Sequence, residues 1–156
     1  MEDKRISSPD EHMVFVYGTL MDDQIVKALL KRVPSSFPAI LHNHNRYKIE
    51  GRVYPAIIPE HSKIVTGKVY PDITDTELDI FDYYEDSGYD KRTVEVVLIE
   101  GLEKLTVHAY VWKNKNELKL HGDWSIDEWK QKYFEDYYRM TIQCIEDYHE
   151  MRDKDW

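Results

Sequence analysis

The feature that most limits how this chain can fold is a glycine that ends an apolar run and opens a helical pattern. The run at residues 13–16 is short, β-branched and aromatic, which is typical of a buried strand, and Tyr17-Gly18-Thr19-Leu20 follows it directly. Gly18 lets the backbone turn sharply and approach a ligand, because it has no Cβ. The helical pattern that follows places apolar residues at Ile25, Val26, Leu29 and Leu30. The sequence therefore predicts a glycine turn at a strand end, which is a place where substrates bind.

The backbone amides of this turn are the first candidate for a binding function. We expect the amides of Gly18, Thr19 and Leu20 to lie near the positive end of the following helix, where they form a nest for a carboxylate or a developing oxyanion. The alternative is a plain tight turn without a ligand, since turns between a strand and a helix are common. The tetrapeptide alone leaves both interpretations open.

The length of 156 residues fits one domain with a sizeable core. We expect a flexible N-terminus at residues 1–12, a single domain at 13–150 and a frayed C-terminus at 151–156. Short apolar runs separated by turn residues predict strands at 39–41, 46–49, 53–58 and 64–70, with Pro55 and Pro59 marking an edge or bulge. Alternation from Thr93 to Leu98, then a polar turn and residues 105–112, predicts a hairpin.

Two capping boxes predict helices. Thr74-Asp75-Thr76-Glu77 begins a helix that carries Glu85 at its far end, and Ser125-Ile126-Asp127-Glu128 begins a long C-terminal helix. The long helix repeats bulky residues at spacings of three and four, namely Trp129, Tyr133, Tyr137, Met140, Cys144 and Tyr148. We interpret this stripe as a packing face, with a cofactor or partner site as the alternative, and we expect Cys144 to be buried rather than reactive.

Composition excludes several classes of function. The formal net charge of -9, without a compensating basic patch, argues against nucleic acid and anionic membranes as partners. A single cysteine excludes an intramolecular disulfide and a multi-thiolate metal site. His42 and His44 lack the further ligands that a metal site needs, so we interpret them as surface residues of a turn. No apolar stretch reaches the length of a membrane span and the first residues do not form a signal peptide, which predicts a cytoplasmic protein.

A second stretch, residues 81–92, ends the middle helix and opens a strand. Together with the Tyr17-Gly18-Thr19-Leu20 turn it resembles the γ-glutamylcyclotransferase-like superfamily, in which a Tyr-Gly-Ser/Thr-Leu loop faces a catalytic glutamate three residues after an apolar-Asp pair. The similarity is greatest to the plant branch, the avirulence-induced-gene proteins. Further counterparts are Gly51-Arg52, the run 93–98, Val111-Trp112, Gly122-Asp123-Trp124 and residues 128–130.

This resemblance implies a fold, a reaction and a set of site residues. The fold is α+β, with a small, partly closed barrel-like sheet flanked by helices and one pocket at the loop. The reaction is intramolecular aminolysis of a small-molecule γ-glutamyl substrate to 5-oxoproline and a free amine or amino acid, without a cofactor or a metal. Glu85 is the catalytic base, and the substrate-binding residues are Phe15, Val16, Tyr17, Gly18, Thr19, Leu20 and Tyr110.

The surroundings of Glu85 predict a raised pKa for its carboxyl group. Its aromatic neighbours Phe81, Tyr83, Tyr84 and Tyr89 would desolvate the charged form, and Asp79, Asp82 and Asp86 would add repulsion that Lys91 and Arg92 oppose. Relatives often have Glu-Gly where this chain has Glu85-Asp86, which places an extra negative charge beside the base.

Alternatives accompany these assignments. Tyr110 either hydrogen-bonds the substrate or is a half-buried aromatic residue of the sheet. The protein itself is either a cyclotransferase, including one acting on γ-glutamylamines or isopeptide-linked fragments, or a catalytically silent binding or interaction module. The sequence carries no indication of an oligomeric state.

Overall fold

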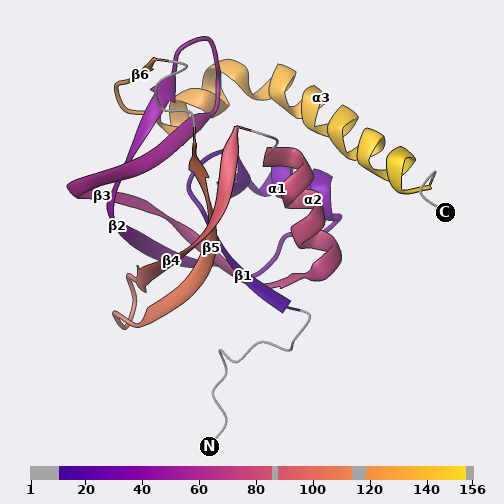
Figure 1. Cartoon of the computed structure of the whole chain (residues 1–156). Helices are drawn as coiled ribbons and strands as arrows, with labels where there is room; N and C mark the ends of the chain where they lie inside the picture. Colours follow the sequence, from indigo (N-terminus) through magenta and orange to yellow (C-terminus); the bar gives the residue numbers. More distant parts are fainter. Residues whose placement is uncertain (1–10, 86–87, 114–118, 154–156) are drawn as a thin grey trace, which may run out of the picture.

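The computed structural model describes residues 11–85, 88–113 and 119–153, and within them the strands form one sheet that closes on itself (Figure 1). The strands are β1 (Glu11–Val16), β2 (Phe37–Ile49), β3 (Pro55–Thr74), β4 (Tyr89–Leu98), β5 (Lys104–Trp112) and β6 (Leu120–His121). Their order is β3-β1-β5-β4-β2-β6, and β2 also pairs with β3, which joins the two sides into a barrel. β1 and β5 are parallel, and the other pairs are antiparallel. The expected α+β fold with a partly closed barrel is confirmed.

β1 explains why the first apolar run shows no alternation. Val14 and Val16 pack into the core between the sheet and the helices, whereas Phe15 and Tyr17 pack into the barrel interior. Because successive side chains of a strand point to opposite faces, a strand that is buried on both faces must be apolar throughout. The strand begins at Glu11, two residues before the expected start of the domain at residue 13.

The four short strands expected between residues 39 and 70 are wrong as separate elements, because the structure has two long strands there. The register jumps from His42 opposite Ile64 to His44 opposite Pro59, so β3 carries extra residues at a bulge. Asn43 and Ser62 take positive φ angles of 58° and 67° at this bulge. Polar bulge residues interrupt the apolar pattern without ending the strands. Pro59 lies at this bulge, as expected.

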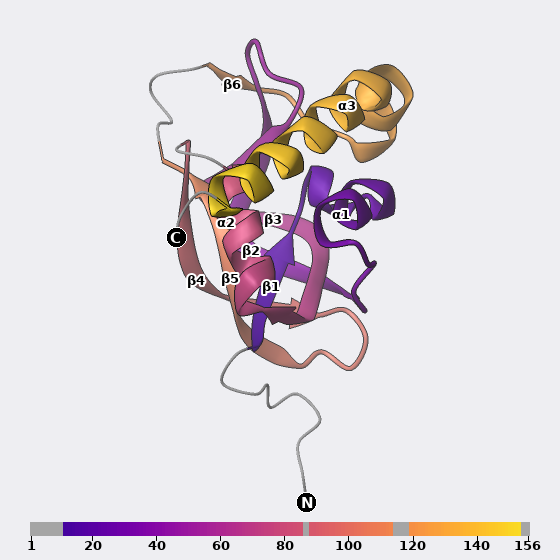
Figure 2. The same cartoon turned by 90° about the vertical axis from the view of Figure 1, so that its right-hand side faces the viewer.

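Helices α1 (Asp23–Leu30), α2 (Asp75–Glu85) and α3 (Ile126–Asp153) lie together on one side of the barrel (Figure 2). The capping box of α2 is confirmed in both directions: the Glu77 amide donates to Thr74 Oγ1 at 3.2 Å, and the Thr74 amide donates to Glu77 Oε1 at 3.1 Å. α2 ends at Glu85, as expected. None of the described helices combines the length and apolar character needed to cross a bilayer.

The packing stripe expected on α3 is correct only in part. Trp129, Tyr137 and Tyr148 are buried, but Tyr133 is 45% exposed and Met140 is 63% exposed. α3 contacts both α1 and α2, and a helix that passes over two neighbours does not keep a single stripe covered along its whole length. The helix also continues to Asp153, beyond the boundary expected at residue 151.

Candidate active site

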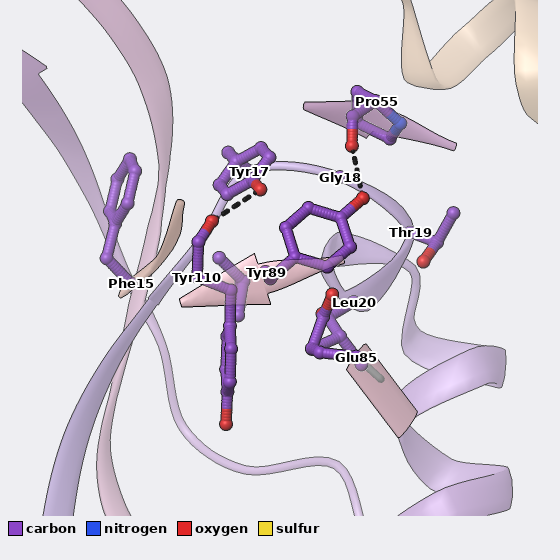
Figure 3. A pocket seen from close by; sticks show the side chains of 10 residues that line it. Phe15, Tyr17, Gly18, Thr19, Leu20, Pro55, Glu85, Tyr89 and Tyr110 are labelled. Atoms are coloured by element: carbon purple, nitrogen blue, oxygen red, sulfur yellow. Dashed lines mark hydrogen bonds between the residues drawn. The ribbon is translucent and has the colours of Figure 1, made fainter. Parts of the chain in front are cut away.

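The loop after β1 brings the predicted binding residues to one pocket. We call it the loop pocket; it is lined by Phe15, Val16, Tyr17, Gly18, Thr19, Leu20, Pro55, Glu85, Tyr89 and Tyr110 (Figure 3). All eight residues predicted for the site are therefore in this lining. The pocket lies where the end of β1, the end of α2 and the central strand β5 meet.

The loop amides do not lie at the end of α1, where we expected them. Thr19–Met21 forms a separate 3-10 turn, in which the Met21 amide donates to the Gly18 carbonyl at 3.0 Å. The N-terminus of α1 is instead capped by Asp22, whose Oδ1 accepts from the amides of Gln24 and Ile25 at 3.0 and 3.1 Å. A carboxylate at this position satisfies the orphan amides of the helix. Any anion bound by the loop therefore uses the 3-10 turn rather than α1.

Gly18 is required by close packing. Its φ is -130°, which other residues also adopt, so the left-handed conformation is not the reason for glycine. A Cβ at this position would lie 2.8 Å from Cγ and 3.0 Å from Cδ of Pro55. Pro55 in turn is held through its carbonyl, which accepts from the Tyr89 hydroxyl at 2.7 Å (Figure 3). Gly18 thus allows β3 and the strand after α2 to close over the loop.

Glu85 is the carboxyl group of the loop pocket, and its pKa is raised to about 8. Desolvation by burial is the main cause, and the negative charge of Asp82, one turn earlier on α2, is the second. Of the aromatic neighbours that we expected, Tyr84 and Tyr89 lie beside Glu85 in pockets of the protein. Phe81 is buried in the core, and Tyr83 packs against Tyr148 of α3. The predicted direction of the pKa shift is confirmed.

Of the other charges named beside Glu85, Asp79 and Lys91 form ion pairs with groups other than Glu85. Asp79 accepts from the Tyr148 hydroxyl at 2.8 Å and pairs with Arg152. Lys91 does not reach the base directly but pairs with Asp82 at 2.9 Å. Asp86 lies outside the described residues.

Tyr110 uses its hydroxyl within the protein. The hydroxyl donates to Asp82 Oδ1 at 2.6 Å, and the Tyr110 carbonyl accepts from the Tyr17 hydroxyl at 2.6 Å. Figure 3 shows the Tyr110 hydroxyl at the end of the ring that lies farthest from the loop. Of the two interpretations of Tyr110, these contacts favour a buried aromatic residue of the sheet that also fixes Asp82.

Three hydroxyl groups tie the loop to two helices beside Glu85. Thr19 Oγ1 lies 2.6 Å from the Tyr84 hydroxyl and 3.3 Å from the Tyr137 hydroxyl, and the two tyrosine hydroxyls lie 2.6 Å apart. Three contacts among three hydroxyl groups can use all three protons. The triangle joins the loop, α2 and α3, and so fixes the position of Thr19 relative to the helix that carries the base.

Pro55, Tyr89 and Tyr137 were not predicted from the sequence as residues of the site. Pro55 was recognised only as a strand signal, Tyr89 only as a neighbour of Glu85, and Tyr137 only as a packing residue. No local motif marks them, because the fold brings them to Glu85 from β3, β4 and α3.

His42 and His44 lie at the bulge between β2 and β3. His44 Nδ1 lies 2.9 Å from the carbonyl of His42 across the β2 bulge. Within residues 11–85, 88–113 and 119–153, no group of three His, Cys, Asp or Glu side chains is placed to hold a metal ion.

Comparison with known proteins shows the family to which this chain belongs. Residues 14–130 match the family model described as "Gamma-glutamyl cyclotransferase, AIG2-like". The chain belongs to this family. AIG2-like protein C of Arabidopsis thaliana is 43% identical over 141 residues, covering 90% of this chain and 82% of that protein. AIG2-like protein D of the same plant is 45% identical over 137 residues, covering 87% of this chain and 90% of its own length.

Solved structures show the same fold. A solution structure of an Arabidopsis thaliana protein that is 32% identical gives a TM-score of 0.71 and covers 92% of this chain and 96% of that one. A structure titled gamma-glutamyl cyclotransferase gives a TM-score of 0.63 at 17% identity, covering 85% of this chain and 86% of that one. At this low identity the second likeness concerns the fold alone.

Proposed function

We propose that the protein is a γ-glutamylcyclotransferase. The α-amino nitrogen of a γ-glutamyl amide attacks the γ-carbonyl carbon of the same molecule, the bond from that carbon to the leaving nitrogen breaks, and 5-oxoproline and a free amine form. Counted from the α-ammonium form, the attacking nitrogen loses two protons to become the lactam N–H, and the leaving nitrogen gains two when it departs as an ammonium ion. The reaction needs neither water nor a cofactor, because the nucleophile is part of the substrate.

Glu85 is the base in this proposal, and the observation that carries it is that the Glu85 carboxyl group lines the same pocket as the Gly18 loop. A peptide α-amino group has a pKa near 8, and the α-carboxylate of a γ-glutamyl unit raises that pKa further. The pKa of Glu85 is raised to about 8, which brings the carboxyl group closer to the amine than an ordinary glutamate would be. Proton transfer between groups of similar pKa is close to balanced, so Glu85 can take the proton from the ammonium and return it to the leaving nitrogen. A carboxylate at its ordinary pKa would be a much weaker base.

The loop at Gly18 supplies hydrogen-bond donors for the proposed reaction. Amides of Gly18, Thr19 and Leu20 are the candidate donors to the oxygen of the γ-carbonyl as it becomes negative, or to the α-carboxylate. A loop whose conformation is fixed before substrate binds needs no reorganisation during the reaction. The remaining task is to hold the substrate chain bent for closure of a five-membered ring, an orientation effect worth several kcal/mol.

The test is direct detection of 5-oxoproline from a panel of γ-glutamyl compounds, with Glu85→Gln as the variant. Glutamine keeps the size of the side chain but cannot accept the proton, so we expect turnover to fall about 10²–10⁴-fold with little change in substrate binding. Glu95→Gln, at an exposed glutamate of β4, is the matched control and should keep wild-type turnover. Wild-type turnover in Glu85→Gln would overturn the assignment of the base.

The same experiment tests the silent-module alternative. If the wild-type protein binds γ-glutamyl compounds but releases no 5-oxoproline from any of them, the cyclotransferase proposal is wrong and the fold serves as a binding module.

A further inference from the structure

A second and larger pocket meets the loop pocket at Glu85. It shares Thr19, Glu85 and Tyr89 with the loop pocket. The rest of its lining is Tyr54, Tyr84, Tyr137, Met140, Thr141 and Cys144, and we call it the aromatic pocket. Its cavity has a volume of about 230 Å³, compared with about 20 Å³ for the loop pocket. A volume of 20 Å³ holds little more than one water-sized group, so most of a γ-glutamyl amide that reacts at the loop lies outside the loop pocket. The aromatic pocket is the adjoining cavity, because the two share lining residues.

Five of the six hydroxyl groups on the described residues that line the aromatic pocket are already used within the protein, and that of Tyr54 is the sixth. Thr19, Tyr84 and Tyr137 bond to one another, and the Tyr89 hydroxyl donates to the Pro55 carbonyl. Thr141 Oγ1 donates to the Tyr137 carbonyl at 2.9 Å. Their protons are therefore not offered to a ligand, and the lining presents mainly ring surfaces and aliphatic carbons.

The described lining of the aromatic pocket contains an acidic residue but no cationic residue. Among the described residues that line it, Glu85 is the only acidic one, and none is Lys, Arg or His. Two lysines on strands and helices that contribute to this lining serve other carboxylates: Lys91 of β4 pairs with Asp82 at 2.9 Å, and Lys130 of α3 pairs with Asp22 at 2.6 Å. A leaving group with its own carboxylate would thus be desolvated without a cationic partner, which is unfavourable.

The size and mouth of the pocket fit an aromatic group. A dry cavity of about 150 Å³ is sufficient to hold benzene, so 230 Å³ accepts a ring and a short linker. Met140 is 63% exposed, although it lies on the face of α3 that carries Tyr137 and Cys144. An exposed methionine beside tyrosine rings is a surface that adapts to apolar ligands.

We propose that the aromatic pocket binds the leaving group of the substrate. It selects γ-glutamyl amides whose leaving group contains an aromatic ring and carries no charge while it is part of the amide. This assignment rests on the cyclotransferase function proposed above and adds the class of substrate. Tyr54 and Met140 are the residues that determine specificity, because they line this pocket but not the loop pocket and no hydrogen bond of the loop depends on them.

Three substrates that differ in one feature each test the proposal. γ-Glutamyl-phenethylamine is aromatic and uncharged, γ-glutamyl-phenylalanine adds a carboxylate, and γ-glutamyl-ethylamine lacks the ring. We expect kcat/KM for the phenethylamine derivative to exceed that for each of the others by about 10-fold or more, since loss of apolar burial or an unpaired buried charge costs that much. Glutathione, whose leaving dipeptide carries a carboxylate, should react no better than γ-glutamyl-phenylalanine.

A charge placed at the mouth should reverse part of this preference. Met140→Lys supplies a cation for the carboxylate, so the ratio of kcat/KM for γ-glutamyl-phenylalanine to that for γ-glutamyl-phenethylamine should rise about 10-fold. Met151→Lys makes the same change at an exposed position of α3 that is outside the pocket lining, and it should leave the ratio unchanged. An equal change in both variants would mean that net charge alone is responsible, and would overturn the proposal.

Binding to the Glu85→Gln protein separates this proposal from the function on which it rests. Calorimetry with the three intact substrates should show the same order of affinity, whether or not the wild-type protein turns them over. A preference in binding without 5-oxoproline release would contradict the cyclotransferase function but support the pocket. Release of 5-oxoproline with equal kcat/KM for all three substrates would support the function and overturn the pocket assignment.

Discussion

Arg46 of β2 donates from Nη1 to the carbonyl of Tyr17 at 2.8 Å and to the carbonyl of Thr66 at 2.9 Å. The peptide unit between Tyr17 and Gly18 is planar and trans, so holding its carbonyl toward Arg46 directs the Gly18 amide to the opposite side. Arg46 is itself partly buried, and burial lowers its pKa from the ordinary arginine value. A guanidinium therefore fixes the orientation of the loop without touching the loop pocket.

We expect Arg46→Met to impair catalysis by releasing this peptide unit. Methionine keeps much of the length of the side chain but leaves two carbonyls unpaired, which costs about 1–3 kcal/mol of stability for each that stays buried. The value of kcat should fall more than KM rises, because the loop amides act mainly on the charge that develops during the reaction. Arg46→Lys, which retains a charged donor, should recover part of kcat; equal kcat in both variants would argue against a positioning role.

The pH dependence of activity should report Glu85. If the base must be ionised, kcat/KM rises with pH up to the pKa of Glu85, which is about 8. Asp82→Asn removes the second cause of the raised pKa and should move this limb to lower pH. Lys91→Met removes the cation that pairs with Asp82 and should move it to higher pH. Ionisation of the substrate amine also affects the pH profile, but its contribution is the same for all variants. Shifts of kcat/KM in the same direction for Asp82→Asn and Lys91→Met would therefore contradict the assignment of this pKa to Glu85.

The free energy of unfolding should depend on pH through the ionisation of Glu85, and Glu85→Gln should remove this part of the dependence. The pKa of Glu85 is above the ordinary value of 4.5, so between pH 4.5 and about 8 the folded protein holds a proton that the unfolded chain has lost. The free energy of unfolding contributed by this group therefore decreases as pH rises through that window. Denaturant unfolding at several pH values should show the wild-type protein losing stability relative to Glu85→Gln from low to high pH. A constant difference would mean that the pKa is not raised.

Gly18→Ala should destabilise the protein through Pro55. A Cβ would approach two ring carbons of Pro55 to 2.8 and 3.0 Å, and overpacking of this kind typically costs about 1–3 kcal/mol. Pro55→Ala removes both ring carbons, so the double variant should be more stable than the sum of the two single effects predicts. Thermal or denaturant unfolding of the four proteins measures this coupling. Additive effects would show that the glycine is needed for another reason.

The parts of the fold that were predictable are those encoded locally. The capping box at Thr74 and Glu77 needs only the spacing of two polar residues, and the apolar run before Tyr17 needs only its composition. The long strands β2 and β3 were not recognised, because the bulge at Asn43 and Ser62 interrupts their apolar pattern and is stabilised by pairing across the sheet.

The candidate site divides in the same way. Glu85 and the loop carry a sequence motif and were predicted together, whereas Tyr137 lies more than fifty residues away from either. Its hydroxyl reaches Thr19 and Tyr84 only because α3 packs over α1 and α2. The role of Arg46 was not predicted for a related reason. Arg46 donates to the backbone carbonyl of Tyr17, and a backbone carbonyl is present at every residue, so the side chains of the loop do not indicate this contact.

Blocking the substrate amine distinguishes the proposed reaction from metal-dependent hydrolysis. In intramolecular aminolysis, acetylation of the α-amino group abolishes turnover because the nucleophile is lost, and a chelator has no effect. A hydrolase would release glutamate, tolerate acetylation where the pocket has room, and lose activity with its metal, since the metal prepares the attacking water. The first outcome is expected because the described residues that line the loop pocket offer one carboxylate, Glu85, and too few other ligands for a divalent ion. Mass spectrometry of the product decides: glutamate in place of 5-oxoproline would contradict the proposed reaction.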